Sequence, residues 1–117
     1  MQAMLLIYSD EAKWAAMDPA EQGAVIGACG AYVEALRAAG AMRGGERLMP
    51  SATAHSLRVQ GGAPQVLDGP YAETKEQLAG FFLLEVPDMQ AALHWAARCP
   101  GASHGTLEIR EVWPAPA

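Results

Sequence analysis

The sequence predicts an α+β fold with a mainly antiparallel sheet and two main helices. Strand and helix signals alternate in the order strand, helix, hairpin, strand, helix, strand. Two of the strands are apolar on both faces, which is typical of strands that are covered on each side. This order is that of a ferredoxin-like arrangement. The 117 residues suit one domain, which we expect to span residues 1–113, with a tail at residues 114–117.

The composition excludes several classes of protein. Hydrophobic residues make up 51% of the chain and charged residues 18%, as in a folded globular protein. The net charge is −5 and the eight Lys and Arg residues are scattered, which argues against a nucleic-acid partner. No apolar run approaches ~20 residues, so we expect no membrane span. The N-terminus lacks a secretion signal and the isolated Cys29 and Cys99 lack metal or redox spacing, which favours a cytoplasmic protein with reduced thiols.

The first strand and the first helix have clear boundaries. Met4–Tyr8 is a short apolar run that predicts a strand. Asp18, Pro19 and Glu21 predict a helix start, with Asp18 as the cap and Glu21 completing a capping box. Gly40 ends this helix. Its expected buried stripe has helical spacing and consists of Val25, Ile26, Cys29, Val33 and Leu36.

A hairpin is expected in the middle of the chain. Gly44–Gly45 predicts a turn within a short irregular strand. Residues 54–60 then alternate in polarity, and Gly61–Gly62 separates them from residues 65–67. His55 shares the inward face of its strand with Leu57 and Val59. A single histidine there is typical of a hydrogen-bonded core residue, yet it can also exchange protons near neutral pH.

The connection that follows the hairpin holds the densest polar cluster. Gly69 and Pro70 force a sharp turn and leave the Asp68 carboxylate at the strand end. Residues 72–78 predict a short helix or helical turn that Gly80 ends, and residues 81–84 predict the central strand. The cluster consists of Asp68, Glu73, Lys75 and Glu76. Such charges on a loop favour binding, although they can also be solvated surface groups, with Asp68 capping a turn.

The C-terminal third predicts a helix and a last strand. Asp88 caps the helix, which runs to about Arg98, and its expected buried stripe is Met89, Ala92, Leu93 and Ala96. His94 lies on the opposite, solvated side. Pro100–Gly101 ends the helix, His104 falls in the loop, and Thr106–Val112 is a strand with Leu107 and Ile109 facing inward.

The apolar pattern also predicts a homodimer. Two helices cover only one face of the sheet, so the other face would expose an apolar patch drawn from Met4, Ile7, Phe81 and Leu83. A second copy that packs sheet against sheet would cover it through an isologous contact.

The segment DGPYAETKEQLAGFFLLEVPD at residues 68–88 resembles the DGPF-domain branch of the YciI-like, or YCII-related, family. MLLIYSDEAKW and AALHWAARCPGASHGTLEIREV resemble that family's first strand and last helix–strand pair. Tyr71 stands where the motif has Phe, and Ala79 stands where it often has Gly. The resemblance implies a ferredoxin-like fold that dimerises into an α/β barrel. The acid/base dyad proposed for the wider family uses a first-helix histidine; this chain has none before His55, so that dyad is not carried over.

Three functional hypotheses compete. The first is an enzyme acting on a small anionic or cyclic carboxylic molecule in a cleft of the dimer, because proteins of similar fold include lyases and dehydrochlorinases. Asp68 would be its acid or base, with His55 as a second candidate. Its ligand-binding residues would be Gly69, Pro70, Glu73, Lys75 and Glu76, with Lys75 holding an anion. The second hypothesis is a non-catalytic ligand-binding or accessory module linked to transcription regulation. The third is a purely structural protein.

No cofactor or metal is expected. His55, His94 and His104 lack the spacing of metal ligands. The paired glycines lack the pattern and the lysine of a phosphate-binding loop. Nothing in the sequence indicates haem or flavin.

Overall fold

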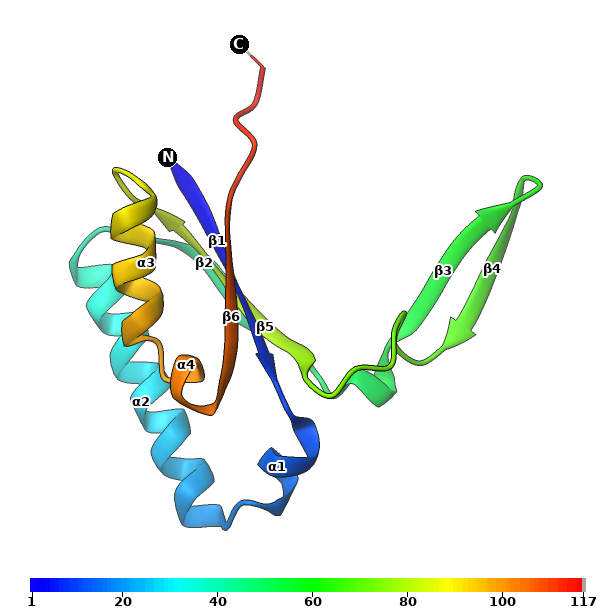
Figure 1. Cartoon of the computed structure of the whole chain (residues 1–117), viewed down its shortest axis with the longest axis horizontal. Coiled ribbons are helices and arrows are strands. Elements are labelled where there is room, and N and C mark those ends of the chain that lie inside the picture. The colour runs from blue at the N-terminus through cyan, green and yellow to red at the C-terminus, as the bar shows by residue number, and fades with distance from the viewer. Residues whose placement is uncertain (117) are drawn as a thin grey trace.

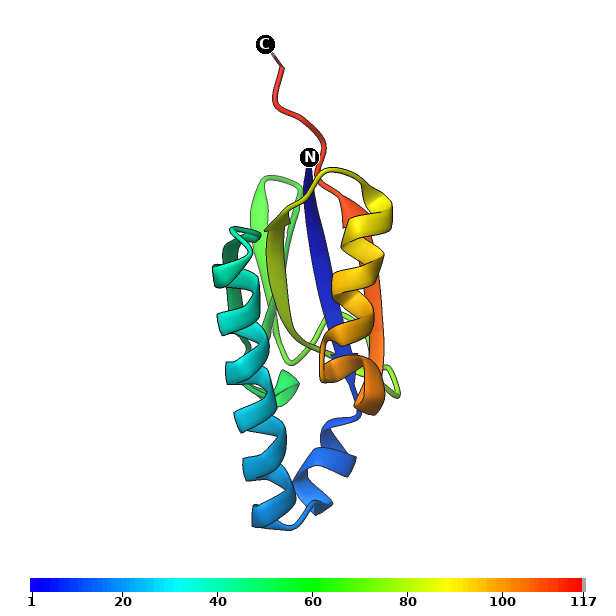
Figure 2. The ribbon, with the colours of Figure 1, turned by 90° about the vertical axis from the view of Figure 1, so that its left-hand side faces the viewer.

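The fold was analysed in a computed structural model that describes residues 1–116. Its main sheet is antiparallel, in the order β2-β5-β1-β6. The strands are β1 (Gln2–Ser9), β2 (Met42–Arg47), β5 (Gln77–Glu85) and β6 (Gly105–Glu111). Helices α2 (Pro19–Ala38) and α3 (Met89–Arg98) both lie on one face of this sheet (Figures 1 and 2). The α+β class and the antiparallel sheet are therefore confirmed, and the described chain by itself does not close into a barrel.

The remaining elements are α1 (Glu11–Ala16), the 3₁₀ turn η1 (Ser51–Thr53), α4 (Gly101–His104) and the strands β3 (His55–Gln60) and β4 (Ala63–Asp68). Among them, α1, η1 and α4 lie near the lower end of the sheet in Figure 1, and the β3–β4 hairpin begins there. The β3–β4 hairpin projects away from the sheet, on the side opposite the helices (Figure 1). Its turn is the predicted glycine pair, with φ of 58° at Gly61 and 79° at Gly62. Helix α1 was not predicted. His104, which was expected in a loop, is the last residue of the short helix α4.

The core lies between the sheet and the two helices. Alternation along β1 and β5 turns every second side chain toward the helices, and the fully buried side chains of largest volume are Leu5, Leu36 and Leu84. Tyr32 of α2 is also buried, and its hydroxyl donates a hydrogen bond of 2.7 Å to the carbonyl of Trp95 in α3. This bond ties the two helices together above the sheet.

The predicted helix stripes were partly wrong. Ile26 is 54% exposed and Leu93 is 51% exposed, while Tyr32 and Trp95 take their places against the sheet. Asp18 caps α2 as predicted. Its side chain accepts from the N–H of Ala20, not from that of Glu21, so the predicted capping box does not form. The N-terminal half of α2 extends past the sheet (Figure 1), which explains why Ile26 finds no core to enter.

Two predicted glycine turns are instead places where strands approach closely. Gly45 lies within β2, where a Cβ atom would be 2.6 Å from Cδ1 of Phe82. Gly80 lies within β5 rather than ending a turn, and its Cβ would be 2.6 Å from the carbonyl oxygen of Glu46. Both glycines therefore serve the packing of β2 against β5.

The helical turn predicted for residues 72–78 is also wrong. The chain there is irregular until β5 begins at Gln77. The Thr74 hydroxyl donates to the Glu76 carbonyl at 2.6 Å, and the Gln77 side-chain amide donates to the Thr74 carbonyl at 2.6 Å. Such local side-chain bonds offer the backbone an alternative to helical pairing.

The face of the sheet that points away from the helices is apolar at its centre. Register pairs Met4 with Leu83 and Leu6 with Phe81, so these side chains share that face. We call Met4, Leu6, Tyr8, Phe81 and Leu83 the open face. Alternate residues of the same two strands, such as Leu5 and Leu84, turn toward α2 and α3 and are buried. Ile7, which we expected in this patch, packs against the core instead.

Strand β6 supplies a polar margin to the open face. Register pairs Met4 with Arg110 and Leu6 with Glu108. The Arg110 Nε atom lies 3.1 Å from Oε2 of Glu108, and the Tyr8 hydroxyl lies 3.4 Å from Oε1 of Glu108. The predicted inward direction of Leu107 and Ile109 is confirmed by their packing against the core.

Candidate functional site

The hairpin brings two of the predicted site residues together. Register pairs His55 of β3 with Asp68 of β4, and His55 Nδ1 lies 3.0 Å from Asp68 Oδ1. The next pair toward the body, Ala54 and Gly69, is joined by an N–H···O bond of 2.6 Å. Hydrogen-bonded and non-hydrogen-bonded pairs alternate along an antiparallel ladder, so His55 and Asp68 form a non-hydrogen-bonded pair, in which side chains approach most closely.

This arrangement has a definite chemical capacity. A carboxylate that accepts a hydrogen bond at Nδ1 orients the imidazole ring and leaves Nε2 free to exchange a proton with another molecule. The carboxylate also stabilises the imidazolium that forms when Nε2 takes up that proton. The His55–Asp68 pair can therefore act as a general base and then return the proton as a general acid.

The turn after Asp68 holds the base of the hairpin in place. Gly69 has φ of +109°, a value that favours glycine, which confirms the sharp turn predicted there. The Ser56 hydroxyl donates to the Gly69 carbonyl at 2.9 Å. Pro70 follows and is half-buried. Gly69 and Pro70 thus shape the backbone beside the pair.

A glutamate that the sequence analysis missed anchors this region to the sheet. The Glu11 carboxylate accepts bonds from the Ser51 N–H at 2.7 Å and from the Ser51 hydroxyl at 2.8 Å. The Glu11 N–H donates to Gln77 Oε1 at 3.0 Å. Asp10 caps α1 by accepting from Ala12 and Lys13. The Asp-Glu start of this helix was the signal that could have predicted it.

The other predicted ligand-binding residues do not join the pair. Glu73 and Lys75 are exposed, and among residues 1–116 no hydrogen bond or ion pair links either of them to His55 or Asp68. Glu76 is half-buried, and its Oε1 accepts a bond of 2.9 Å from the Thr106 hydroxyl of β6. Glu76 therefore belongs to the sheet end, whereas Glu73 and Lys75 lie on the loop between the sheet and the hairpin.

The pair is open to solvent in the single chain. The side chains of His55 and Asp68 are 70% and 93% exposed. The inward face predicted for His55, Leu57 and Val59 was wrong in this respect, because all three are exposed. Even a fully charged pair with this exposure contributes only about 0–1 kcal/mol to stability, so folding energy gives little reason for its geometry.

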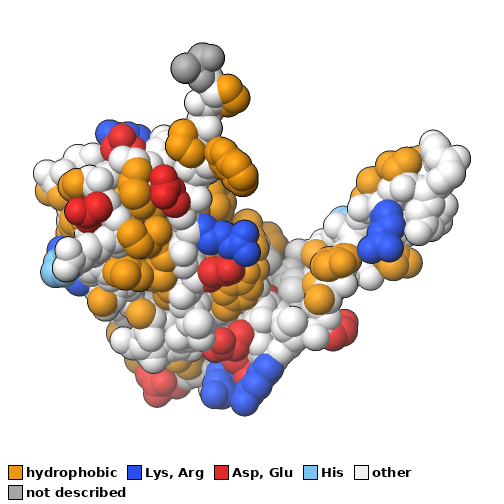
Figure 3. All heavy atoms as spheres, turned by 45° about the horizontal axis from the view of Figure 1, so that its top comes forward, with side chains coloured by type: hydrophobic (Ala, Val, Ile, Leu, Met, Phe, Trp, Pro, Cys, Tyr) orange, Lys and Arg blue, Asp and Glu red, His pale blue; other side chains and the backbone are white. Residues whose placement is uncertain are grey.

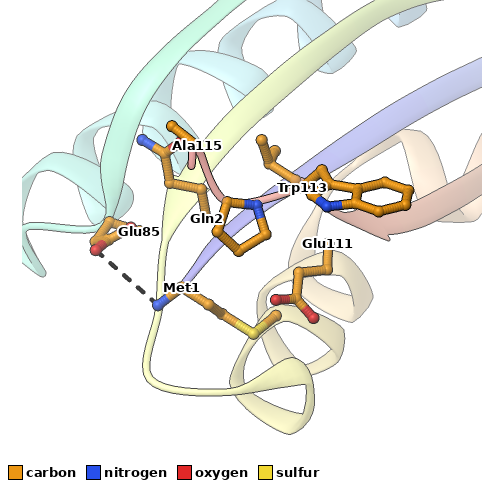
Figure 4. A pocket seen from close by; sticks show the side chains of 8 residues that line it. Met1, Gln2, Glu85, Glu111, Trp113 and Ala115 are labelled. Atoms are coloured by element: carbon orange, nitrogen blue, oxygen red, sulfur yellow. Dashed lines mark ion pairs between the residues drawn. The ribbon is translucent and has the colours of Figure 1, made fainter. Parts of the chain in front are cut away.

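Two shallow hollows lie elsewhere. One, of 280 Å³, is lined by residues of both chain ends, such as Met1 and Trp113, and by Glu85 at the end of β5. The Met1 amino group lies 4.0 Å from the Glu85 carboxylate (Figure 4). The other, of 250 Å³, adjoins it along residues 111–114. Neither contains His55 or Asp68. Pro114 and Ala115 of the predicted tail line these hollows. The last residue of the tail, Ala117, lies outside the described residues.

Burial changes the acidity of three side chains, two of which lie in the core. It raises the pKa of the Cys29 and Cys99 thiols, so both stay protonated near neutral pH and are poor nucleophiles. Burial likewise raises the pKa of Tyr32. Within residues 1–116, no three His, Cys, Asp or Glu side chains gather where they could hold a metal ion. No helix in that range has the length and apolar character needed to cross a membrane.

Comparison with known proteins identifies the family. The YCII-related domain matches residues 1–116. An uncharacterized protein of Rhizobium meliloti (strain 1021), R00369, is 36% identical over 110 residues, which cover 92% of this chain and 89% of that protein. The match over nearly the whole chain is sufficient for family membership: the protein belongs to the YCII-related domain family.

Proposed function

We propose that this protein is a homodimer that binds a small anionic or cyclic carboxylic molecule beside His55 and Asp68 and moves a proton on it. The observation that carries the proposal is the 3.0 Å contact between His55 Nδ1 and Asp68 Oδ1. A carbon acid placed at Nε2 would give its proton to the imidazole, and a leaving group on the neighbouring carbon would depart with its bonding electrons, in the manner of a lyase or dehydrochlorinase.

The other parts of the proposal follow from the fold. The strand order β2-β5-β1-β6 supports a ferredoxin-like arrangement, and the motif at residues 68–88 supports the DGPF-domain branch. We assign residues 1–113 to one domain followed by a tail, and we place the protein in the cytoplasm. Two open faces packed against each other would complete the dimeric barrel.

Lys75 is the residue best suited to attract an anion. It lies on the exposed loop that joins the hairpin to β5, with Glu73 nearby in sequence. A flexible ammonium on this loop would attract a carboxylate that approaches the pair, and Gly69, with its φ of +109°, starts the loop beside Asp68. This role would make Lys75 a binding residue and His55 and Asp68 the proton-transfer residues.

A second function is a binding or accessory module without chemistry, which could serve transcription regulation. The high exposure of the pair in the single chain favours it, because general acid–base groups act best where water is excluded. The two functions share one site and differ in whether the bound molecule changes.

The test uses 5-oxotetrahydrofuran-2-carboxylate, a cyclic carboxylic acid with C–H bonds beside a lactone carbonyl. We expect it to raise the melting temperature, and in D₂O we expect deuterium to replace the hydrogen beside the carbonyl, as followed by NMR. Asp68→Asn should slow this exchange by about 10²-fold or more, the usual contribution of a positioned acid–base group. His94→Gln, an exposed histidine on α3, is the control.

Stabilisation without deuterium exchange would favour the binding module. The proposed ligand class would be refuted if neither this acid nor benzoate raised the melting temperature and no deuterium exchange occurred.

A further inference from the structure

The hairpin has one apolar face. Pairing in β3–β4 places opposite each other Leu57 and Val66, and Val59 and Pro64. Because alternate pairs share a face, these side chains lie on the same face as His55 and Asp68. We call Leu57, Val59, Pro64 and Val66 the arm face. The opposite face carries Ser56, Arg58, Gln60, Gln65 and Leu67.

The arm face is uncovered in the single chain. Leu57, Val59 and Val66 are 63%, 61% and 56% exposed, and hydrophobic side chains lie bare along the projecting hairpin (Figure 3). Every described residue of β4 is exposed. A two-stranded hairpin that packs against nothing is marginally stable in water, so this one needs a surface to lie on.

The dimensions of the chain indicate how large that surface is. The radius of gyration is 16.2 Å, against about 13 Å for a compact domain of this length. The accessible surface is 7938 Å², about 1,800 Å² more than the ~6,100 Å² of a typical folded monomer of this mass. If two chains each bury that excess, the total falls in the range of obligate homodimers, about 2,000–5,000 Å².

One partner can cover both apolar surfaces. The hairpin projects from the same side of the sheet as the open face (Figure 1), so a body placed against the sheet also meets the hairpin. A second copy offers the same two surfaces in return, and a two-fold contact then covers all four. Arm face and open face are mainly uncharged, which suits contact between chains that each carry a net charge of −5.

We propose that the β3–β4 hairpin is an arm that docks on a second copy of this chain, and that this docking encloses the His55–Asp68 pair. The inference rests on the proposed function and deepens it, because the site would be incomplete in one chain. The pair lies on the arm face, so a surface that covers Leu57 and Val66 also excludes water from His55. Water exclusion strengthens the interaction of His55 with Asp68 and with a bound anion.

The first test is the oligomeric state. Leu57→Asp with Val66→Asp places two carboxylates on the arm face, and we expect the dimer dissociation constant to rise at least about tenfold, as for loss of central interface contacts. Leu67→Asp is the matched control, since Leu67 is 71% exposed on the opposite face of the same hairpin. It should leave the dimer unchanged in sedimentation and light-scattering measurements. Because these side chains lie outside the core formed with α2 and α3, both variants should keep the helical signal of the wild-type circular dichroism spectrum.

The second test is the accessibility of the three histidines to diethyl pyrocarbonate, measured by mass spectrometry. His94 and His104 are exposed outside the arm and serve as internal references. In the wild-type dimer and in Leu67→Asp, His55 should react at least about tenfold more slowly than the references. In the Leu57→Asp/Val66→Asp variant, His55 should react as fast as His94 and His104.

The outcomes separate the two proposals. A wild-type chain that is monomeric at micromolar concentration would overturn both the dimer and the docked arm. A dimer that survives the arm-face double substitution, with His55 as reactive as His94, would overturn the arm alone and leave the sheet-to-sheet dimer standing. Equal loss of the dimer in Leu67→Asp would also overturn the docked arm, because the contact would then not be specific to the arm face.

Discussion

Tyr32→Phe removes one hydroxyl from the core and nothing else. That hydroxyl donates to the Trp95 carbonyl at 2.7 Å. Trp95 is in the last turn of α3, where the cap N–H of Cys99 bonds to the carbonyl of Ala96 rather than to that of Trp95. The ring of Tyr32 keeps its edge-to-face contacts with Phe82 and Trp95 in the variant.

The expected loss combines two effects. A net hydrogen bond contributes about 1 kcal/mol, and a buried carbonyl without a partner costs about 1–3 kcal/mol, so we expect the free energy of unfolding to fall by about 1–2 kcal/mol. With an unfolding entropy of about 0.25 kcal/mol/K for 117 residues, the melting temperature should drop by about 4–8 °C. Calorimetry at equal protein concentrations measures this. Tyr71→Phe is the control, because Tyr71 is 83% exposed.

The difference in the free energy of unfolding between wild type and Tyr32→Phe should decrease as the pH rises into the alkaline range. Burial raises the pKa of Tyr32 above its unfolded value, so the contribution of its hydroxyl is complete below about pH 10 and is lost as the pH rises further. Above that pH, the unfolded wild type releases a proton that the folded form retains. The stability gap between wild type and Tyr32→Phe should therefore close by about 1.4 kcal/mol per pH unit. A gap below about 0.3 kcal/mol at neutral pH, or one that widens at alkaline pH, would refute the assigned bond.

Two further predictions concern glycines and cysteines. Gly80→Ala should lower the free energy of unfolding by about 1–3 kcal/mol, because its Cβ would lie 2.6 Å from the Glu46 carbonyl oxygen. Gly27→Ala in α2, with nothing within 4 Å of the new Cβ, should raise it by about 0.5–1 kcal/mol, and urea unfolding compares the two. Cys99 is buried and Cys29 half-buried, so iodoacetamide should alkylate Cys29 first, as followed by mass spectrometry, and equal rates would contradict this packing.

Sequence reasoning succeeded where local chemistry decides structure. Asp18 and Asp88 cap their helices as predicted, and the Gly61–Gly62 turn pairs the strands that flank it. Each of these features depends on a few adjacent residues with a strong conformational preference. The same is true of Gly69, whose φ of +109° the Gly–Pro sequence anticipates.

Sequence reasoning failed where a residue distant in sequence determines the structure. Gly45 and Gly80 read locally as turn residues, but β2 and β5 approach so closely that only glycine fits. Ile26 has the right spacing for a buried stripe, yet α2 extends past the sheet at that point and leaves it 54% exposed. Glu11 gave a local signal for a helix start, but its bonds to Ser51 involve a segment forty residues away. None of these depends on neighbours in sequence.

The His55–Asp68 pair stands between these two cases. The residues are thirteen apart, yet a two-residue turn at Gly61–Gly62 sets which residues of β3 and β4 face each other. Once that turn is accepted, the opposition of His55 and Asp68 follows from counting along the strands. A one-residue change in loop length would turn one of the two side chains to the other face. The local turn therefore determines the geometry of the pair, whereas in the proposed dimer the environment of the pair depends on the surface that the arm face meets. The proposed chemistry and the proposed assembly both involve this one short hairpin, and the substitutions Asp68→Asn and Leu57→Asp/Val66→Asp test them separately.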